Sequence, residues 1–259
     1  MTAVLEIKNL TKAFGGLTAV SDLSFNIPKG KIYGVIGPNG AGKTTVFNQI
    51  TGIYPPTSGE IMFEGKSLLG LKPSTIAQMG VARTFQNLRL FKKLTALENV
   101  MIACQHDCNY NLLTAIIRTK HYRQEEKRIK DEAESLLDII GLSQYINQTA
   151  SNLPYGHQRR LEIARAMALN PRLLLLDEPA AGMNPEESIA LMEFIRDIKD
   201  KFNLTILLIE HHMELVMGIC EHIVVLNFGK EIANGNPEAI QNNPDVITAY
   251  LGEEVSEDE

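Results

Sequence analysis

The chain has 259 residues, 44% of them hydrophobic and 22% charged, a balance that excludes a disordered or fibrous protein. Its formal net charge is -6 and its pI is near 5.6, which argues against a general binder of nucleic acids or anionic membranes. No apolar run reaches the roughly 18 residues of a membrane span, and residues 1–10 lack the basic start and apolar core of a secretory signal. We therefore expect a cytosolic protein that does not cross a membrane by itself.

The first third of the chain is expected to form strands around one strand–loop–helix unit. Residues 4–10 alternate apolar and polar side chains, as in a half-buried strand. The apolar run at 31–36 leads through glycines into a helix over 43–51, which Gly52 ends. Three further short strands are predicted at 22–27, 60–63 and 81–85.

The middle of the chain is expected to be helical. Its helical pattern runs from about 94 to 142 and is clearest over 122–140, where apolar residues recur at three- and four-residue spacing. A further helix over 155–169 stops before Pro171, because the residue before a proline is disfavoured in the helical region. The sequence therefore predicts an all-helical insert followed by a helix that leads out of it.

The last third alternates buried strands with helices. Four leucines at 173–176 form a strand, a helix follows over 185–201, and another strand covers 205–209. This β-α-β alternation is typical of a parallel sheet with right-handed crossovers. Strands at 223–226 and 231–233 then lead to a polar helix and to an acidic end, 253–259, which we expect to be disordered.

The three cysteines do not predict a disulfide framework. Cys104, Cys108 and Cys220 are an odd and sparse set, which suits reduced intracellular thiols. Cys104 and Cys108 flank His106, but no fourth ligand follows at a matching spacing. We therefore expect structural thiols in preference to a metal site.

The strongest chemical signal is the pattern G-x-x-x-x-G-K-[ST] at 37–44, between a predicted strand and a predicted helix. Glycines let successive backbone N–H groups point at phosphate oxygens, and the helix N-terminus adds a favourable dipole. Lys43 is expected to reach the β and γ phosphates, and the Thr44 hydroxyl to bind Mg²⁺. The predicted nucleotide-binding residues here are Gly37, Pro38, Asn39, Gly40, Ala41, Gly42, Lys43, Thr44 and Thr45.

The leucine strand ends in two carboxylates, Asp177 and Glu178. Ligands of parallel sheets gather at the carboxyl ends of the strands. We expect Asp177 to hold Mg²⁺, directly or through water, and Glu178 to accept a hydrogen bond from the attacking water as general base.

In its order of motifs the chain resembles the ATP-binding subunits of ABC transporters over roughly residues 4–252. The resemblance implies that Gln86 senses Mg²⁺ or the attacking water, and that His211 hydrogen-bonds the γ-phosphate. It implies that Phe14 stacks on adenine. It also implies that the segment 153–158 occupies the place of the family's LSGGQ signature, so Tyr155, Gly156 and His157 would contact the γ-phosphate bound by a partner subunit.

The chain departs from the family pattern at three positions. Pro154 replaces the signature serine and removes a hydroxyl and an N–H, which leaves the N–H groups of residues 155–157 and the helix dipole. His157 replaces the signature glutamine, and Asn184 occupies the usual position of an aspartate. These departures leave open whether both sites of a dimer are equally active.

The resemblance implies an α/β fold: a P-loop NTPase (RecA-like) core with an N-terminal antiparallel β region and an inserted all-α subdomain. The expected domains are a nucleotide-binding core (1–87 and 159–235), a helical subdomain (88–158) and a C-terminal helix with its acidic tail (236–259).

The sequences of several segments, notably 177–182, 207–211 and 242–252, resemble those of the ATP-binding subunits of high-affinity branched-chain amino acid importers. That resemblance implies an ATPase on the inner face of the cell membrane that uses ATP and Mg²⁺. It implies two permease subunits, a second ATP-binding subunit of the same or a related kind and, indirectly, an extracytoplasmic solute-binding protein. It implies no nucleic acid partner.

Several alternatives remain open on the sequence. Urea and amide importers and the lipopolysaccharide-export ATPase are similar in sequence, so the cargo rests on resemblance alone. Soluble ABC-type proteins usually carry two cassettes or large added domains, which 259 residues do not accommodate. Another P-loop enzyme, such as a kinase or GTPase, would leave the segment 153–158 and His211 unexplained.

Overall fold

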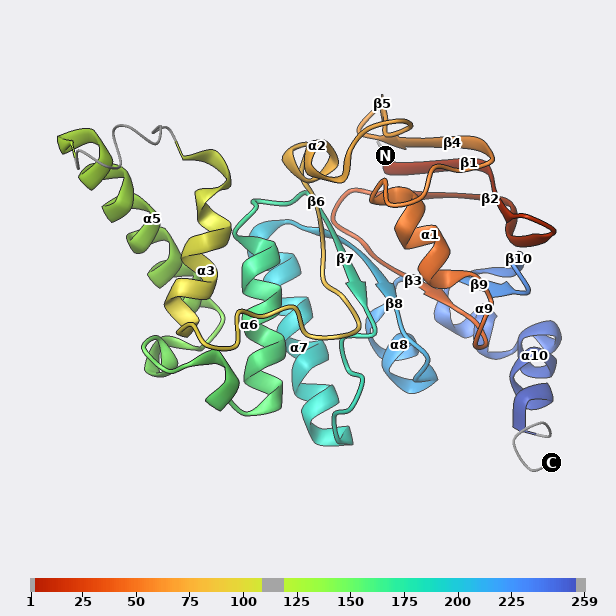
Figure 1. Ribbon diagram of the computed structural model, residues 1–259. Helices are drawn as coiled ribbons and strands as arrows, with labels where there is room; N and C mark the ends of the chain where they lie inside the picture. Colours follow the sequence, from red (N-terminus) through yellow and green to blue (C-terminus); the bar gives the residue numbers. More distant parts are fainter. Residues whose placement is uncertain (1–2, 109–118, 255–259) are drawn as a thin grey trace. The chain divides into compact units, whose positions relative to one another are not determined.

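The computed structural model describes residues 3–108 and 119–254. Contacts divide the chain into two compact units, residues 1–83 with 172–259 and residues 84–171. Figure 1 labels the helices and strands of both units.

The first unit contains two sheets. A six-stranded sheet has the order β10-β9-β3-β8-β7-β6, in which only β10 runs antiparallel to its neighbour. Its strands are β3 (Ile32–Ile36), β6 (Val81–Arg83), β7 (Leu173–Asp177), β8 (Thr205–Ile209), β9 (His222–Asn227) and β10 (Lys230–Gly235). Every residue of β7 and β8 is buried, as expected for central strands of a parallel sheet. The predicted parallel sheet is thus confirmed.

The second sheet of this unit is antiparallel, with the order β2-β1-β4-β5. Its strands are β1 (Ala3–Phe14), β2 (Leu17–Pro28), β4 (Ser58–Phe63) and β5 (Lys66–Ser67). One hydrophobic core joins this sheet, the buried face of α1 (Lys43–Ile50) and the parallel sheet. The phosphate loop that precedes α1 is therefore held from both sides by sheets.

The remaining helices of the first unit surround the parallel sheet or lie near the C-terminus. They are α2 (Pro73–Gln78), α7 (Pro185–Phe202), α8 (Met213–Ile219), α9 (Pro237–Gln241) and α10 (Pro244–Glu254). The expected disorder of the acidic end is wrong for residues 253–254, which continue α10, and 255–259 lie outside the described residues. None of the described helices is long and apolar enough to cross a membrane.

The second unit is helical where the structure describes it. Its helices are α3 (Ala96–Cys104), α5 (Lys120–Ile139) and α6 (Tyr155–Met167), with short 3₁₀ turns at Gln105–Asp107, Ser143–Tyr145 and Ala150–Asn152. α3 packs against both α5 and α6. The buried residues of α5 are those that the periodicity indicates, Ile129, Ala133, Leu136 and Leu137.

Two predicted boundaries are wrong for identifiable reasons. The strand expected over 81–85 ends at Arg83, and two residues later the carbonyl of Phe85 accepts a hydrogen bond from the Arg159 guanidinium. The helix expected to end at residue 169 ends at Met167, and Asn170 adopts a left-handed conformation with φ 50° just before Pro171.

Candidate functional site

The loop between β3 and α1 has a backbone that requires glycine. Gly37 and Gly42 have φ values of 146° and 102°, outside the range of ordinary L residues. A Cβ atom on Gly37 would lie 2.0 Å from the Leu226 carbonyl oxygen, and one on Gly42 would lie 2.3 Å from the Ala19 carbonyl oxygen. The loop is thus pressed against β9 and β2, and both glycines of the pattern are sterically required.

Lys43 and Thr44 open α1 directly after this loop. Lys43 is buried, and its ammonium donates to the carbonyls of Gly37 (2.6 Å) and Pro38 (2.8 Å). Its positive charge therefore lies inside the curl of the loop. Thr44 is exposed in the first turn of α1, where backbone N–H groups and the helix dipole favour an anion. A phosphate chain and its metal ion both fit these groups.

Asp177 ends β7 and forms a buried ion pair with Arg83 at the end of β6. The Arg83 Nη2 to Asp177 Oδ2 distance is 2.7 Å, and each side chain is only 6% exposed. Arg83 Nη1 also donates to the Asn48 side-chain oxygen at 2.7 Å, which connects the pair to α1. The Asp177 carboxylate and the Thr44 hydroxyl are hard oxygen donors, the type that Mg²⁺ prefers, so these residues fit the expected metal.

Arg83→Met is expected to destabilise the metal-free protein by about 3–5 kcal/mol, because removing one partner of a buried ion pair leaves an uncompensated charge. Urea unfolding followed by circular dichroism measures the loss. Arg128→Met is the control, since Arg128 pairs with Glu125 and Glu132 while its side chain is 39% exposed. That variant should lose about 1 kcal/mol or less, and equal losses in both would contradict a stabilising role for the Arg83 pair.

Glu178 and His211 are brought together at the ends of two adjacent strands, β7 and β8. Glu178 Oε2 lies 3.8 Å from His211 Nδ1, and the Glu178 N–H donates to the Ile209 carbonyl at 2.9 Å. Glu178 has φ 46°, a conformation that costs a non-glycine residue about 1–2 kcal/mol. A partly buried carboxylate beside an exposed imidazole can accept and relay a proton.

Phe14 lies at the end of β1, in the hairpin whose other strand packs on the phosphate loop. Its ring is 42% exposed and makes an edge contact with Tyr54, with centroids 5.3 Å apart. The Lys12 ammonium lies 4.8 Å from the Phe14 centroid and donates to the Pro55 carbonyl. An exposed aromatic surface with a neighbouring cation is available here for a planar ring.

Gln86 belongs to the second unit, on an exposed loop that follows the end of β6. The guanidinium of Arg159 on α6 is fully buried and donates to the carbonyls of Phe85 (2.9 Å) and Gln86 (3.0 Å). Glu162, one helical turn later, pairs with Arg159 at 2.8 Å and accepts from the Arg89 N–H at 3.0 Å. Burial raises the pKa of Glu162, although these hydrogen bonds and the Arg159 charge oppose the shift. This pair fixes the Gln86 loop to α6.

The segment predicted to contact a partner's nucleotide forms the first turn of α6. Pro154 is its N-cap, and the first helical hydrogen bond runs from the Gln158 N–H to the Pro154 carbonyl. The N–H groups of Tyr155, Gly156 and His157 precede that bond, so they lie at the positive end of the helix dipole. The His157 ring contacts Tyr145, and burial followed by the charge of Arg160 lowers its pKa. A helix N-terminus suited to an anion thus exists despite the proline.

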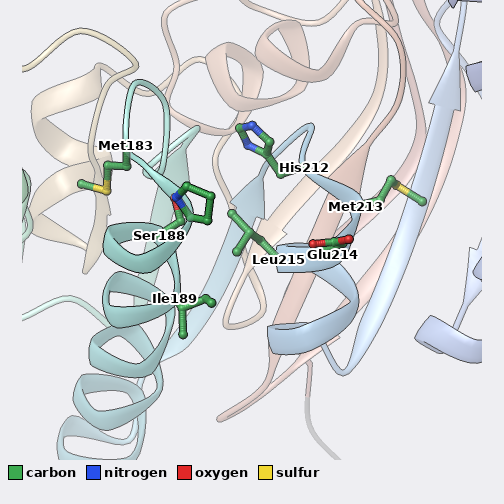
Figure 2. A pocket seen from close by; sticks show the side chains of 8 residues that line it. Met183, Ser188, Ile189, His212, Met213, Glu214 and Leu215 are labelled. Carbon is green, nitrogen blue, oxygen red and sulfur yellow. The ribbon is translucent and has the colours of Figure 1, made fainter.

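Asn184 has a structural role that its sequence position does not reveal. It is the N-cap of α7, where its side-chain oxygen accepts from the Glu187 N–H at 2.9 Å, and the Glu187 carboxylate in turn accepts from the Asn184 N–H at 3.1 Å. The same turn borders a pocket of about 280 Å³ between α7 and α8 (Figure 2). Its walls are mostly apolar, with Met183, Ile189 and Leu215 among the lining residues.

Three groups at these sites were not predicted as functional. Arg83 and the buried Glu210 each act through a partner that is distant in sequence, and the Arg159–Glu162 pair acts on the distant segment that carries Gln86. The one local signal is that Arg159 and Glu162 are three residues apart on a helix, the spacing of neighbouring side chains. Their burial has no signature in the sequence.

Comparison with known families gives two matches. A family model described as "ABC transporter" matches residues 20–181. A second, described as "Branched-chain amino acid ATP-binding cassette transporter", matches residues 230–256. The first match includes the phosphate loop, Gln86, the start of α6 and the Asp177–Glu178 pair.

Individual relatives match nearly the full length. The chain is 49% identical over 250 residues to the high-affinity branched-chain amino acid transport ATP-binding protein BraF of Pseudomonas aeruginosa, with 96% of this chain and 98% of that protein covered. Identity and coverage are the same for LivG of Escherichia coli, which carries the corresponding name. A crystal structure of the ADP conformation of an ATP-binding cassette of an ABC transporter has a TM-score of 0.85 at 30% identity, covering 97% of this chain and 100% of that one.

Proposed function

The chain belongs to the ABC transporter family, and from that premise we propose that it hydrolyses ATP to power a membrane importer for branched-chain amino acids. The observation that carries the ATPase proposal is the convergence, within the first unit, of the phosphate loop, the Asp177 carboxylate and the Glu178–His211 pair. The names of the relatives and the family match at residues 230–256 support the proposed cargo.

In the proposed reaction, each residue has a separate task. Lys43 and the loop amides bind the phosphates, and Phe14 stacks on adenine. Thr44, Asp177 and Gln86 would hold Mg²⁺, which neutralises charge on the phosphates when bound. Glu178 takes the proton of the attacking water, and His211 orients the γ-phosphate. Glu178 is suited to this task because its left-handed backbone holds its carboxylate beside His211.

ATP would drive motion through a head-to-tail dimer. One chain provides residues 37–45, Gln86, Asp177 and His211, and the 153–158 segment of its partner completes each site. ATP contacts both subunits only in the closed dimer, so its differential affinity favours closure, and loss of the γ-phosphate reopens the pair.

The proposed domains are a nucleotide-binding core (1–87 and 159–235), a helical subdomain (88–158) and a C-terminal segment (236–259). The Arg159–Glu162 pair supports a transmitting role for the Gln86 loop.

The proposed location is the cytoplasmic face of the cell membrane. The partners are two permease subunits, a second ATP-binding subunit and, indirectly, an extracytoplasmic solute-binding protein.

Affinity purification of the tagged protein in mild detergent from its native host, with mass spectrometry of the captured chains, tests these assignments. We expect two permease chains and a second ATPase. Capture of the permeases of a urea, amide or lipopolysaccharide system would contradict branched-chain amino acids as the cargo and would assign the cargo of that system instead. Capture of soluble partners alone, with the membrane fraction demonstrably solubilised, would contradict the transport role.

A further inference from the structure

Two consecutive histidines follow β8 and lie against a buried carboxylate. Glu210 is fully buried, whereas the side chains of His211 and His212 are 46% and 49% exposed. The two imidazole rings are adjacent, with centroids 4.0 Å apart and planes inclined by 38°. Figure 2 shows His212 between the first turns of α7 and α8. The proposed ATPase reaction uses His211 and gives no task to His212 or Glu210.

The nitrogen and oxygen atoms of this cluster have the spacing of metal ligands. Glu210 Oε2 lies 3.2 Å from His212 Nδ1 and 3.8 Å from His211 Nδ1. One ligand atom from each of the three residues lies within 4.8 Å of the other two. Ligands of a tetrahedral zinc ion, bound at about 2.0–2.1 Å, are about 3.3 Å apart. Small rotations of the two exposed rings therefore bring all three atoms to coordination distance.

The carboxylate of this cluster is held in place before any ion arrives. Glu210 Oε1 accepts from the Ala180 N–H at 2.9 Å, and Oε2 accepts from the His211 N–H at 3.1 Å. Such outer hydrogen bonds orient a metal-binding carboxylate and are part of a functional metal site. Because Glu210 is buried and the imidazoles are half exposed, an ion can approach from the solvent side and meet a fixed anionic ligand.

The donor set selects the class of ion. Two imidazole nitrogens and one carboxylate oxygen suit zinc and neighbouring transition metals, and two histidines with one glutamate is a known zinc ligand set. Mg²⁺ prefers oxygen donors, so it does not compete strongly for imidazole nitrogens. A fourth ligand is close, since Glu178 Oε2 lies 3.8 Å from His211 Nδ1.

We propose that Glu210, His211 and His212 form a binding site for a divalent transition-metal ion of the zinc class, and that the bound ion stops ATP hydrolysis by holding His211. Binding of the ion depends only on the cluster. The inhibition rests on the proposed function, because it requires that His211 act on the γ-phosphate. His212 is the residue that separates the two roles, as it belongs to the metal cluster alone.

The binding test uses ZnCl₂ and the full chain, freed of metal with EDTA and carrying no histidine tag. Isothermal titration calorimetry should detect one-to-one zinc binding. His212→Gln should weaken that binding at least about 10- to 100-fold, the loss typical of disturbing even an outer partner of a metal site. His222→Gln removes a histidine outside the cluster and serves as the matched control, with binding unchanged. Cys108→Ser tests whether thiols near His106 bind the zinc instead.

The site would be overturned by an absence of zinc binding to the wild-type chain, or by equal binding to wild type and His212→Gln. Zinc binding that is lost in Cys108→Ser would also overturn it. Circular dichroism of each variant shows whether it is folded, and His212 is the ligand chosen for substitution because its side chain is exposed, unlike that of Glu210.

The inhibition test measures ATP hydrolysis at fixed free Mg²⁺ while free Zn²⁺ is raised, with each variant normalised to its own zinc-free rate. The wild-type rate should fall over the zinc range that saturates the site, and the His212→Gln rate should fall only at zinc concentrations at least about tenfold higher. Equal inhibition of both proteins would overturn the regulatory part of the proposal. Absence of ATPase activity in zinc-free wild-type protein is a separate result, which would count against the proposed function and leave the zinc titration interpretable.

Discussion

Glu178→Gln is expected to abolish ATP turnover while ATP binding is preserved. The substitution keeps the size of the side chain but removes its ability to accept a proton, and a positioned general base contributes about 10²- to 10⁴-fold to a rate. Glu178 lies outside the phosphate loop, so its substitution should leave the contacts of ATP with residues 37–45 intact. Phosphate release measures the rate of hydrolysis, and a fluorescent ATP analogue measures binding. The chain contains no tryptophan, so the fluorescence of the analogue is easy to follow.

The matched control for this variant is Glu231→Gln, at an exposed position of β10, which should hydrolyse ATP at the wild-type rate. A Glu178→Gln protein that hydrolyses ATP within about tenfold of the wild-type rate would remove Glu178 from the role of base, since even the low end of general-base catalysis exceeds that factor. Loss of ATP binding in the same variant would instead point to a structural role, connected with its left-handed backbone.

The sequence predicts most of the fold because its strongest patterns are local. Four consecutive leucines at 173–176 predict a strand that is buried on both faces of a sheet, and the structure places them inside the parallel sheet. The glycines of the phosphate loop are equally local signals, because their left-handed conformations are open to few other residues.

The boundaries of elements with weak local sequence patterns are predicted less accurately. β1 extends to Phe14, beyond the predicted range of 4–10. β2 begins at Leu17, before the predicted range of 22–27. Their outer halves are held by pairing with each other, and the register shifts several times along the ladder, so the alternation of apolar residues is interrupted. Short elements such as α2 and α8 depend on packing against the rest of the unit, which sequence periodicity does not report.

The contacts that position the site are the part that sequence reasoning misses. Asp177 is predicted as a metal ligand from its place after a buried strand, but its ion pair with Arg83 joins residues that are 94 positions apart. Glu210 likewise reaches the Ala180 N–H across 30 positions. A lone arginine or glutamate is read from sequence as a solvated residue, because burial of a charge occurs only where a partner is found in three dimensions.

Lys43→Ala is expected to weaken ATP binding about 10- to 100-fold, because hydrogen bonds to charged groups contribute about 1.5–3 kcal/mol and each 1.4 kcal/mol is a factor of ten. The Lys43 ammonium lies inside the loop, held by the carbonyls of Gly37 and Pro38, so it is positioned for phosphate before the nucleotide arrives. Titration with the fluorescent ATP analogue measures the loss, and Lys66→Ala on exposed β5 is the control.

Two effects contribute to the Lys43→Ala loss, and a second ligand separates them. If the ammonium binds the β and γ phosphates, the affinity for ATP should fall much more than the affinity for adenosine, which has no phosphate. If the lysine only stabilises the loop through its two carbonyl contacts, both affinities should fall together, and the thermal unfolding temperature of the nucleotide-free variant should fall as well. Unchanged ATP affinity in a folded Lys43→Ala protein would contradict the assignment of residues 37–45 as a phosphate loop, and with it the basis of the proposed ATPase.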